Sequence, residues 1–192
     1  TEEDDQRGDA SFSTYVNNNK ELIIEIYTYT PMTEEEENAF WAATAWLATP
    51  YVFSRTTGVR GDSSSCGGFV VGCVGELGIN VAMNGTTGTQ NRTTNAMWTA
   101  TGPGSGSIAF DLTSSNPNQR ETILPSQIEL MNVIYYDLSM DGCVDHAAFL
   151  YGLNKDGEYF VINNCRQELT ITKFDTFVTG RYPGNSIIGV KD

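Results

Sequence analysis

Cys66 and His146 are the residues of this 192-residue chain whose types and order could carry out nucleophilic catalysis. Three serines precede Cys66, and the apolar spacing after it predicts a helix that begins there. The amides and the dipole at a helix N-terminus stabilise a thiolate, the reactive form of cysteine, and the amides can bind an oxyanion. Burial as a small apolar side chain, or pairing in a disulfide, is the ordinary role of a cysteine. Cys73, two turns further on among apolar residues, fits that ordinary role.

His146 is the only histidine, so a Cys–His pair has no other base. It begins an apolar segment, residues 147–152, that predicts a rigid strand. The next predicted strand ends in two asparagines where it passes His146 again, and an amide oxygen there can accept the imidazole N–H and fix its tautomer. Asn163 is the first candidate for this role and Asn164 the second, because a bulge at Gly157 would exchange them. A lone histidine is more often structural, and asparagines often end strands, so neither residue alone indicates catalysis. The prediction rests on the order of cysteine, histidine and asparagine along the chain.

The elements around these residues predict an α+β fold, with helices first and antiparallel strands after them. Residues 1–30 predict a polar arm and then, over residues 21–29, a strand rich in Ile and Tyr. Residues 31–192 predict one folded domain that opens with a helix, for which Thr33 and Glu36 form a capping box. The expected buried stripe of this helix consists of Phe40, Ala43 and Leu47.

The second half of this domain predicts a series of short strands. Residues 154–157 supply a turn, so residues 146–163 predict a hairpin. Residues 84–126 are rich in Gly, Thr, Ser and Asn and predict an insertion or long loop, with a short helix near residues 95–100. The expected strands span residues 131–136, 146–150, 158–162, 169–174 and 186–190.

The composition excludes several classes of protein. The net charge is −13 at pH 7, whereas phosphate binding needs a basic surface, so we expect no nucleic-acid partner. No apolar run approaches the roughly 18 residues that a membrane helix needs. The four cysteines form no CxxC pair, and no metal site or cofactor is predicted. Low Lys content and many Thr, Asn, Ser and Gly residues favour a secreted, extracellular or periplasmic protein.

Four short blocks raise the specificity of the Cys–His pattern. They are Ala45-Trp-Leu-Ala-Thr-Pro-Tyr51, Ser65-Cys-Gly-Gly-Phe-Val70, Leu130-Met-Asn-Val-Ile-Tyr-Tyr136 and Asp145-His-Ala-Ala-Phe-Leu-Tyr-Gly152. In this order they resemble the blocks of the NlpC/P60 family, a branch of the papain-like cysteine peptidases: the helix ending in Thr-Pro-Tyr, the Asp-Cys-Ser-Gly-Phe-Val helix, the Gly-Asp-Leu-Val-Phe-Phe strand and the His-Val-Gly-Ile-Tyr-Leu-Gly strand. The similarity covers about residues 38–192.

The resemblance implies a papain-like fold, with N-terminal helices packed on a central antiparallel sheet. It implies a secreted cysteine peptidase or amidase that hydrolyses peptide bonds in the stem peptides of bacterial peptidoglycan. Cys66 would be the nucleophile, His146 the base, and Tyr51 a residue that faces the cysteine and helps to bind substrate or oxyanion. A half-buried core tyrosine is an equal interpretation of Tyr51. The implied partners are a peptidoglycan peptide and an inhibitor or immunity protein.

The sequence departs from the family pattern around the nucleophile and at the third catalytic position. The family's aspartate before the cysteine is Ser65 here, and Asp62 is a candidate for its role. The serine after the cysteine is Gly67. The family's third residue is a histidine; Asn163 stands at its position, and Cys165 is a further candidate because some secreted effector members use a cysteine.

Two further predictions follow from the departures and from the remaining cysteines. A papain-like hydrolase of a protein or another non-wall amide, and an inactive binding module on the same fold, are alternative functions. Cys143 and Cys165 flank the hairpin that carries His146, so we predict a disulfide between them.

Overall fold

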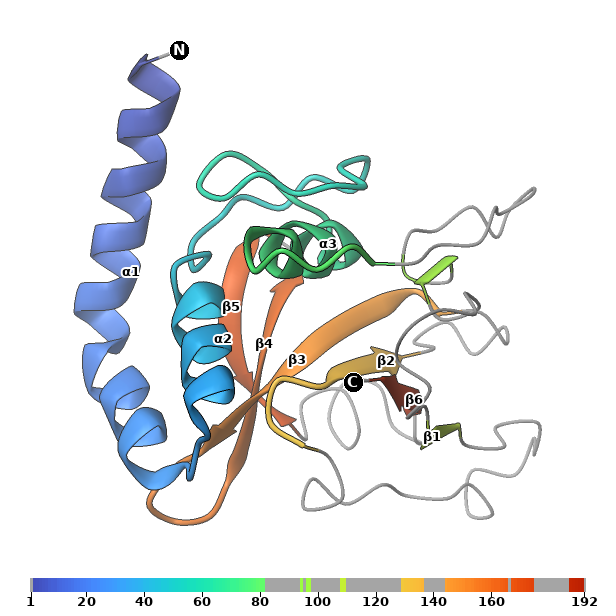
Figure 1. Ribbon diagram of the computed structural model, residues 1–192. Coiled ribbons are helices and arrows are strands. Elements are labelled where there is room, and N and C mark those ends of the chain that lie inside the picture. Colours follow the sequence, from blue (N-terminus) through green and yellow to red (C-terminus); the bar gives the residue numbers. More distant parts are fainter. Residues whose placement is uncertain are drawn as a thin grey trace.

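The computed structural model describes residues 2–81, 94, 96–97, 108–109, 129–136, 144–165, 167–174 and 187–191. Within them, the chain forms three helices and one antiparallel sheet (Figure 1). The helices are α1 (Glu2–Tyr29), α2 (Glu34–Thr44) and α3 (Cys66–Glu76). The strands are β1 (Ile108–Ala109), β2 (Val133–Tyr136), β3 (His146–Leu153), β4 (Tyr159–Cys165), β5 (Glu168–Lys173) and β6 (Ile187–Lys191), in the spatial order β1-β6-β2-β3-β4-β5. The predicted α+β class is confirmed.

The N-terminal segment is one long helix, so the prediction of a polar arm over residues 1–20 and a strand over residues 21–29 is wrong. Its buried residues Ile23 and Ile26, and Thr30 directly after its end, recur at helical spacing. The Ile and Tyr residues of this segment favoured a strand by propensity, but contact with the sheet decides the conformation. Propensity is a weak guide wherever tertiary packing opposes it.

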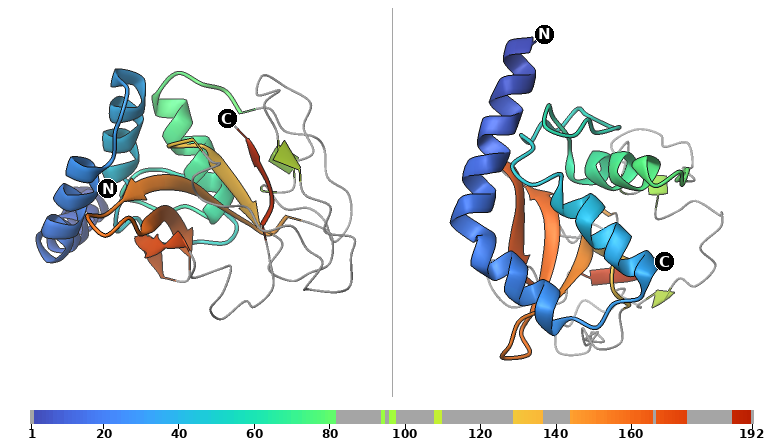
Figure 2. Two further views of the ribbon diagram at one scale, coloured as in Figure 1. Left: turned by 90° about the horizontal axis from the view of Figure 1, so that it is seen from below. Right: turned by 60° about the vertical axis from the view of Figure 1, so that its left-hand side comes forward.

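α1 runs along the β5 edge of the sheet, and its N-terminal end projects beyond the other helices (Figures 1 and 2). The Tyr15 hydroxyl accepts a hydrogen bond from the backbone N–H of Ile171 in β5, at 3.0 Å. At the other end, the Thr30 hydroxyl accepts from the Leu153 amide of β3, at 2.9 Å. An edge strand exposes unpaired amides that invite pairing with another chain, and α1 satisfies one of them.

The predicted start and buried stripe of α2 are confirmed. The Glu36 amide donates to Thr33 Oγ1 at 3.2 Å, and the Thr33 amide donates to Glu36 Oε2 at 2.7 Å, so the capping box is complete. The buried positions include Phe40, Ala43 and Leu47. Phe40 stacks on Tyr151 of β3 with ring centroids 4.3 Å apart, which ties α2 to the central strand.

α3 packs between the sheet and the segment that precedes it. Its inner side contacts β3, where Phe69 meets Phe149 edge-on with ring centroids 5.3 Å apart. Its other side carries glycines, and the amide of Gly58 donates to the Gly68 carbonyl at 2.8 Å. A Cβ at Gly72 would lie 2.4 Å from the Trp46 ring, so only glycine permits this approach.

The predicted strands and hairpin are confirmed, with ends shifted by up to three residues. In the hairpin turn, Asn154 Oδ1 accepts from the amides of Asp156 and Glu158, at 3.0 and 2.9 Å, and Gly157 has φ +77°. Most of the predicted insertion at residues 84–126 lies outside the described residues, as does most of its expected helix near residues 95–100. β1 and the helical residues 94, 96 and 97 are its described parts.

The close packing of α3 predicts opposite effects for two of its glycines. Gly72→Ala forces a methyl group into Trp46, and overpacking of this kind costs about 1–3 kcal/mol of unfolding free energy. Gly75 has no atom within 4 Å of an added Cβ, so Gly75→Ala gains roughly 0.5–1 kcal/mol from helix propensity. Urea unfolding of both variants measures the difference, and equal effects would contradict this account of the α3 interface.

Candidate active site

Cys66 is the first residue of α3, where the sequence predicted a helix start. Ser65 is the N-cap: its hydroxyl oxygen accepts from the Gly68 amide at 2.9 Å, and its O–H donates to the Arg55 carbonyl at 2.6 Å. The Cys66 thiol donates to the main-chain carbonyl of Asp145, with Sγ and O 3.7 Å apart. The sulfur therefore lies against the start of β3, and it is a free thiol.

The Cys66 thiol is protonated at neutral pH, against the expectation that its position at a helix N-terminus would favour the thiolate. Burial raises its pKa to about 11, because the sulfur is removed from water. The backbone amides of Ala147, Gly67 and Cys66 itself lower the pKa, but less than burial raises it. The sequence indicated only the amides that lower the pKa of the thiol. The burial that raises this pKa depends on tertiary packing, which the local sequence does not show.

His146 is hydrogen-bonded to Asn163: its Nε2 lies 3.0 Å from Asn163 Oδ1. The amide group of Asn163 is oriented by β5, since its Nδ2 donates to Thr172 Oγ1 at 3.1 Å and lies 3.5 Å from the Thr170 carbonyl. A carbonyl oxygen only accepts, so Nδ2 faces β5 and Oδ1 faces the imidazole. The neutral imidazole then carries its proton on Nε2, and Nδ1 is the basic nitrogen.

The imidazole is neutral over most of the pH range. Its side chain is 4% exposed, and this burial lowers the pKa of His146 to about 4. The hydrogen bond with Asn163 and the charge of Asp145 raise the pKa, but they offset burial only in part. A neutral imidazole can accept a proton, so the ring is in the protonation state that a general base requires.

The backbone on either side of His146, and not the imidazole, makes the described hydrogen bonds to the Cys66 thiol from β3 and the residue before it. The thiol donates to the carbonyl of Asp145, the residue before His146. The amide of Ala147, the residue after His146, also makes a hydrogen bond to the sulfur. The imidazole itself lies beside Tyr136 of β2, with ring centroids 5.6 Å apart. Among the described contacts of Cys66 there is no hydrogen bond to the imidazole. Proton transfer between them requires the thiol to turn away from the Asp145 carbonyl.

The other predicted site residues have different positions. Asn164 does not bond the imidazole: its Nδ2 donates to the Ser64 carbonyl at 3.0 Å and contacts the Ser64 hydroxyl. Tyr51 is half-buried and pairs with Ser64 through a parallel β-bridge. Asp62 makes an exposed ion pair with Arg55 at 2.6 Å. The proposed disulfide lies outside the described residues, because Cys143 and the side chain of Cys165 are not described.

Three contacts around the site were not predicted. Thr172 and Thr170 orient Asn163, and the alternation of Thr with Leu and Ile in β5 could have indicated them. The Thr94 hydroxyl donates to the Val144 carbonyl at 3.0 Å, so a described part of the insertion packs beside the start of β3. The Asn164–Ser64 link joins residues 100 positions apart and has no local signal.

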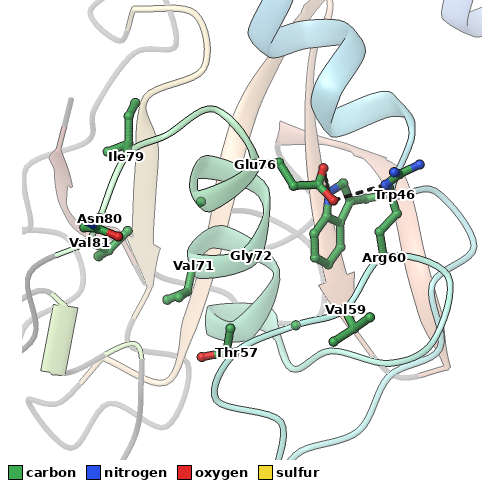
Figure 3. Close-up of a pocket in the computed structure, with 12 residues that line it drawn as sticks. Trp46, Thr57, Val59, Arg60, Val71, Gly72, Glu76, Ile79, Asn80 and Val81 are labelled. Carbon is green, nitrogen blue, oxygen red and sulfur yellow. Dashed lines mark hydrogen bonds and ion pairs between the residues drawn. The ribbon is translucent and has the colours of Figure 1, made fainter.

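A separate pocket of about 500 Å³ lies beside α3 (Figure 3). Its lining includes Gly72 and Gly75, whereas Cys66, Phe69 and Cys73 are buried against the core, so the pocket is on the other side of the helix from the thiol. At its rim, Glu76 accepts from the Trp46 indole at 3.0 Å and from Arg60 at 3.2 Å (Figure 3). These groups satisfy one another, and the pocket forms no part of the Cys66 site.

Comparison of the chain with protein-family models, with curated proteins and with solved structures finds no match. Within the described residues, no helix combines the length and apolar character that crossing a membrane requires. The described residues also contain no group of three or more His, Cys, Asp and Glu side chains that could hold a metal ion.

The lowered pKa of His146 predicts a pH-dependent stability. The imidazole titrates at about 4 in the folded chain and near its ordinary value of 6.5 when unfolded, so the unfolded state binds its proton first as the pH falls. The contribution is fully present above pH 6.5 and is lost towards pH 4, and it amounts to roughly 3 kcal/mol.

The measurement compares urea unfolding of the wild type and of His146→Gln from pH 7 to pH 4. Carboxylates titrate in both proteins, so the difference between the two curves isolates the imidazole. We expect the wild type to lose more stability than the variant over this range. Parallel curves would show that the ring is not buried in its neutral form.

Proposed function

We propose that this chain is a cysteine peptidase or amidase in which Cys66 is the nucleophile, His146 the general base and Asn163 the residue that orients the base. The observation that carries the proposal is the meeting of three distant segments. The thiol at the start of α3 contacts the residue before the only histidine, and Nε2 of that histidine bonds Asn163. A nucleophile, a base and an orienting group are the parts that covalent acyl transfer needs.

The resting protonation states define the order of the steps. Both partners are neutral, so Sγ gives its proton to Nδ1 of His146 as it attacks the substrate carbonyl. The amides of Cys66 and Gly67 at the start of α3 stabilise the oxyanion. The imidazolium then protonates the leaving amine, the C–N bond breaks, and a thioester remains on Cys66. Water, deprotonated by Nδ1, attacks the thioester. The C–S bond breaks, the acid is released, and the imidazolium returns its proton to Sγ, which restores the thiol.

Asn163 supports both half-reactions. Its Oδ1 accepts from Nε2, which keeps Nδ1 basic, and its own amide is fixed by Thr172. The same hydrogen bond raises the pKa of His146, which favours proton uptake from the thiol. Cys165 is the alternative third residue, and its place in β4 two residues further along puts it on the same strand.

The substrate class rests on the resemblance of the four blocks to the NlpC/P60 family. We propose peptide bonds of peptidoglycan stems as the target, a papain-like fold for the domain, and action outside the cell or in the periplasm. Tyr51 adjoins Ser64, two residues before the nucleophile, and is a candidate for contact with the substrate. An inhibitor or immunity protein is a further proposed partner.

A specific observation favours another candidate, an inactive binding module. The Cys66 thiol bonds a main-chain carbonyl and its pKa is raised to about 11, and a protonated, hydrogen-bonded thiol is a poor nucleophile. The non-wall hydrolase shares the catalytic residues and differs only in its substrate. Ser65 and Gly67, at positions where the family has aspartate and serine, favour this alternative.

The test is digestion of purified muropeptides, followed by mass spectrometry of the products. We expect release of stem-peptide fragments by the wild type and by Cys73→Ala, the matched control in the same helix. Cys66→Ala should lower kcat/KM by at least about a thousandfold, because the nucleophile is lost. His146→Gln should act in the same direction.

Two results would contradict the proposal. Undiminished release by Cys66→Ala would exclude a cysteine nucleophile at this site. If the wild type releases nothing, labelling of Cys66 by iodoacetamide separates the alternatives: faster labelling than of Cys73 favours another amide substrate, and equally slow labelling favours the binding module.

A further inference from the structure

Two consecutive asparagines of β4 hold the two halves of the candidate site. Successive side chains of a strand point to opposite faces, so Asn163 and Asn164 diverge from one point of the backbone. Asn163 bonds the imidazole of His146. Asn164, which is fully buried, bonds Ser64, two residues before Cys66.

The segment before Cys66 is held from several directions. The Ser64 carbonyl accepts from the Val52 amide at 2.9 Å and from Asn164 Nδ2 at 3.0 Å, and the Ser64 amide donates to the Pro50 carbonyl at 3.0 Å. Pro50 in turn bridges β5 at Glu168. Of these partners, only Asn164 lies on β4, the strand whose Asn163 bonds the imidazole of His146.

A contribution to the stability of the fold does not explain why residue 164 is an asparagine. Its Oδ1 is buried and has no hydrogen-bond partner in the described part of the chain. An unsatisfied buried acceptor costs about 1–3 kcal/mol, so an apolar side chain of similar size would suit the fold better if Nδ2 were not needed. The donor end of the side chain, directed at Ser64, is therefore the reason for an asparagine here.

We propose that Asn164 is a positioning residue, which fixes the thiol of Cys66 relative to the imidazole of His146 by clamping Ser64 to the strand that carries Asn163. The inference rests on the proposed function for its kinetic consequence. It assigns to Asn164 a role different from the third catalytic residue, since the described hydrogen bonds of its amide go to Ser64. One strand end thereby sets the spacing between nucleophile and base, because β4 bonds the base through Asn163 and the segment before the nucleophile through Asn164.

The test compares Asn164→Ala with Asn154→Ala. Asn154 is also buried and hydrogen-bonded, lies in the same hairpin, and contacts no site residue, so it controls for loss of stability. We expect Asn164→Ala to lower kcat on muropeptides by about 10- to 100-fold with little change in KM, because misplacement of reacting groups costs about this much. Alkylation of Cys66 by iodoacetamide should become faster, since the clamp on its segment is released.

A folding defect alone would move the two variants together. Equal kcat and equal alkylation rates in Asn164→Ala and the wild type, or equal changes in Asn154→Ala, would overturn the inference. If Asn164→Ala does not fold, Asn164→Leu replaces it; it removes the donor to Ser64 and keeps the volume of the side chain, and a kcat unchanged from the wild type is then the overturning result. In a wild type that cleaves no muropeptide the proposed function fails, and the alkylation rates still decide the inference.

Discussion

The contact between the start of α3 and the start of β3 is the constraint on which the site depends. It joins the Cys66 thiol to the Asp145 carbonyl, and the rest of the described fold holds the two ends in place. Phe69 of α3 packs against Phe149 of β3. On the other side of α3, the Gly58 amide donates a hydrogen bond to the Gly68 carbonyl. A helix N-terminus is thus packed against a strand, with its first side chain excluded from water.

This burial has two consequences that act in opposite directions. It keeps both the thiol and the imidazole neutral, and neutral groups cost little to bury, so the arrangement is compatible with a stable core. In the proposed mechanism, it also delays formation of the thiolate until a substrate carbonyl is present. The amides of Gly67 and Ala147 favour the charged form of the sulfur and are already in position, so they can act as soon as the proton leaves.

The sequence predicted the parts of the site that depend on local signals. The start of α3 follows from its serines and apolar spacing, and the pairing of His146 with Asn163 follows from a hairpin with a recognisable turn. It did not predict α1. The Ile and Tyr residues of this segment led to the prediction of a strand, although the positions that become buried recur at helical spacing. It also did not predict the neutral state of Cys66, since desolvation depends on segments far away in the chain.

The central claim is that Cys66 forms a covalent intermediate with its substrate, and acid-quenched intact-protein mass spectrometry during muropeptide turnover tests it most directly. We expect an added mass equal to the acyl part of the substrate on the intact wild type and on Cys73→Ala, and digestion of the quenched protein should locate it on the peptide that contains Cys66. Product formation without that adduct, continuing in Cys66→Ala, would contradict it.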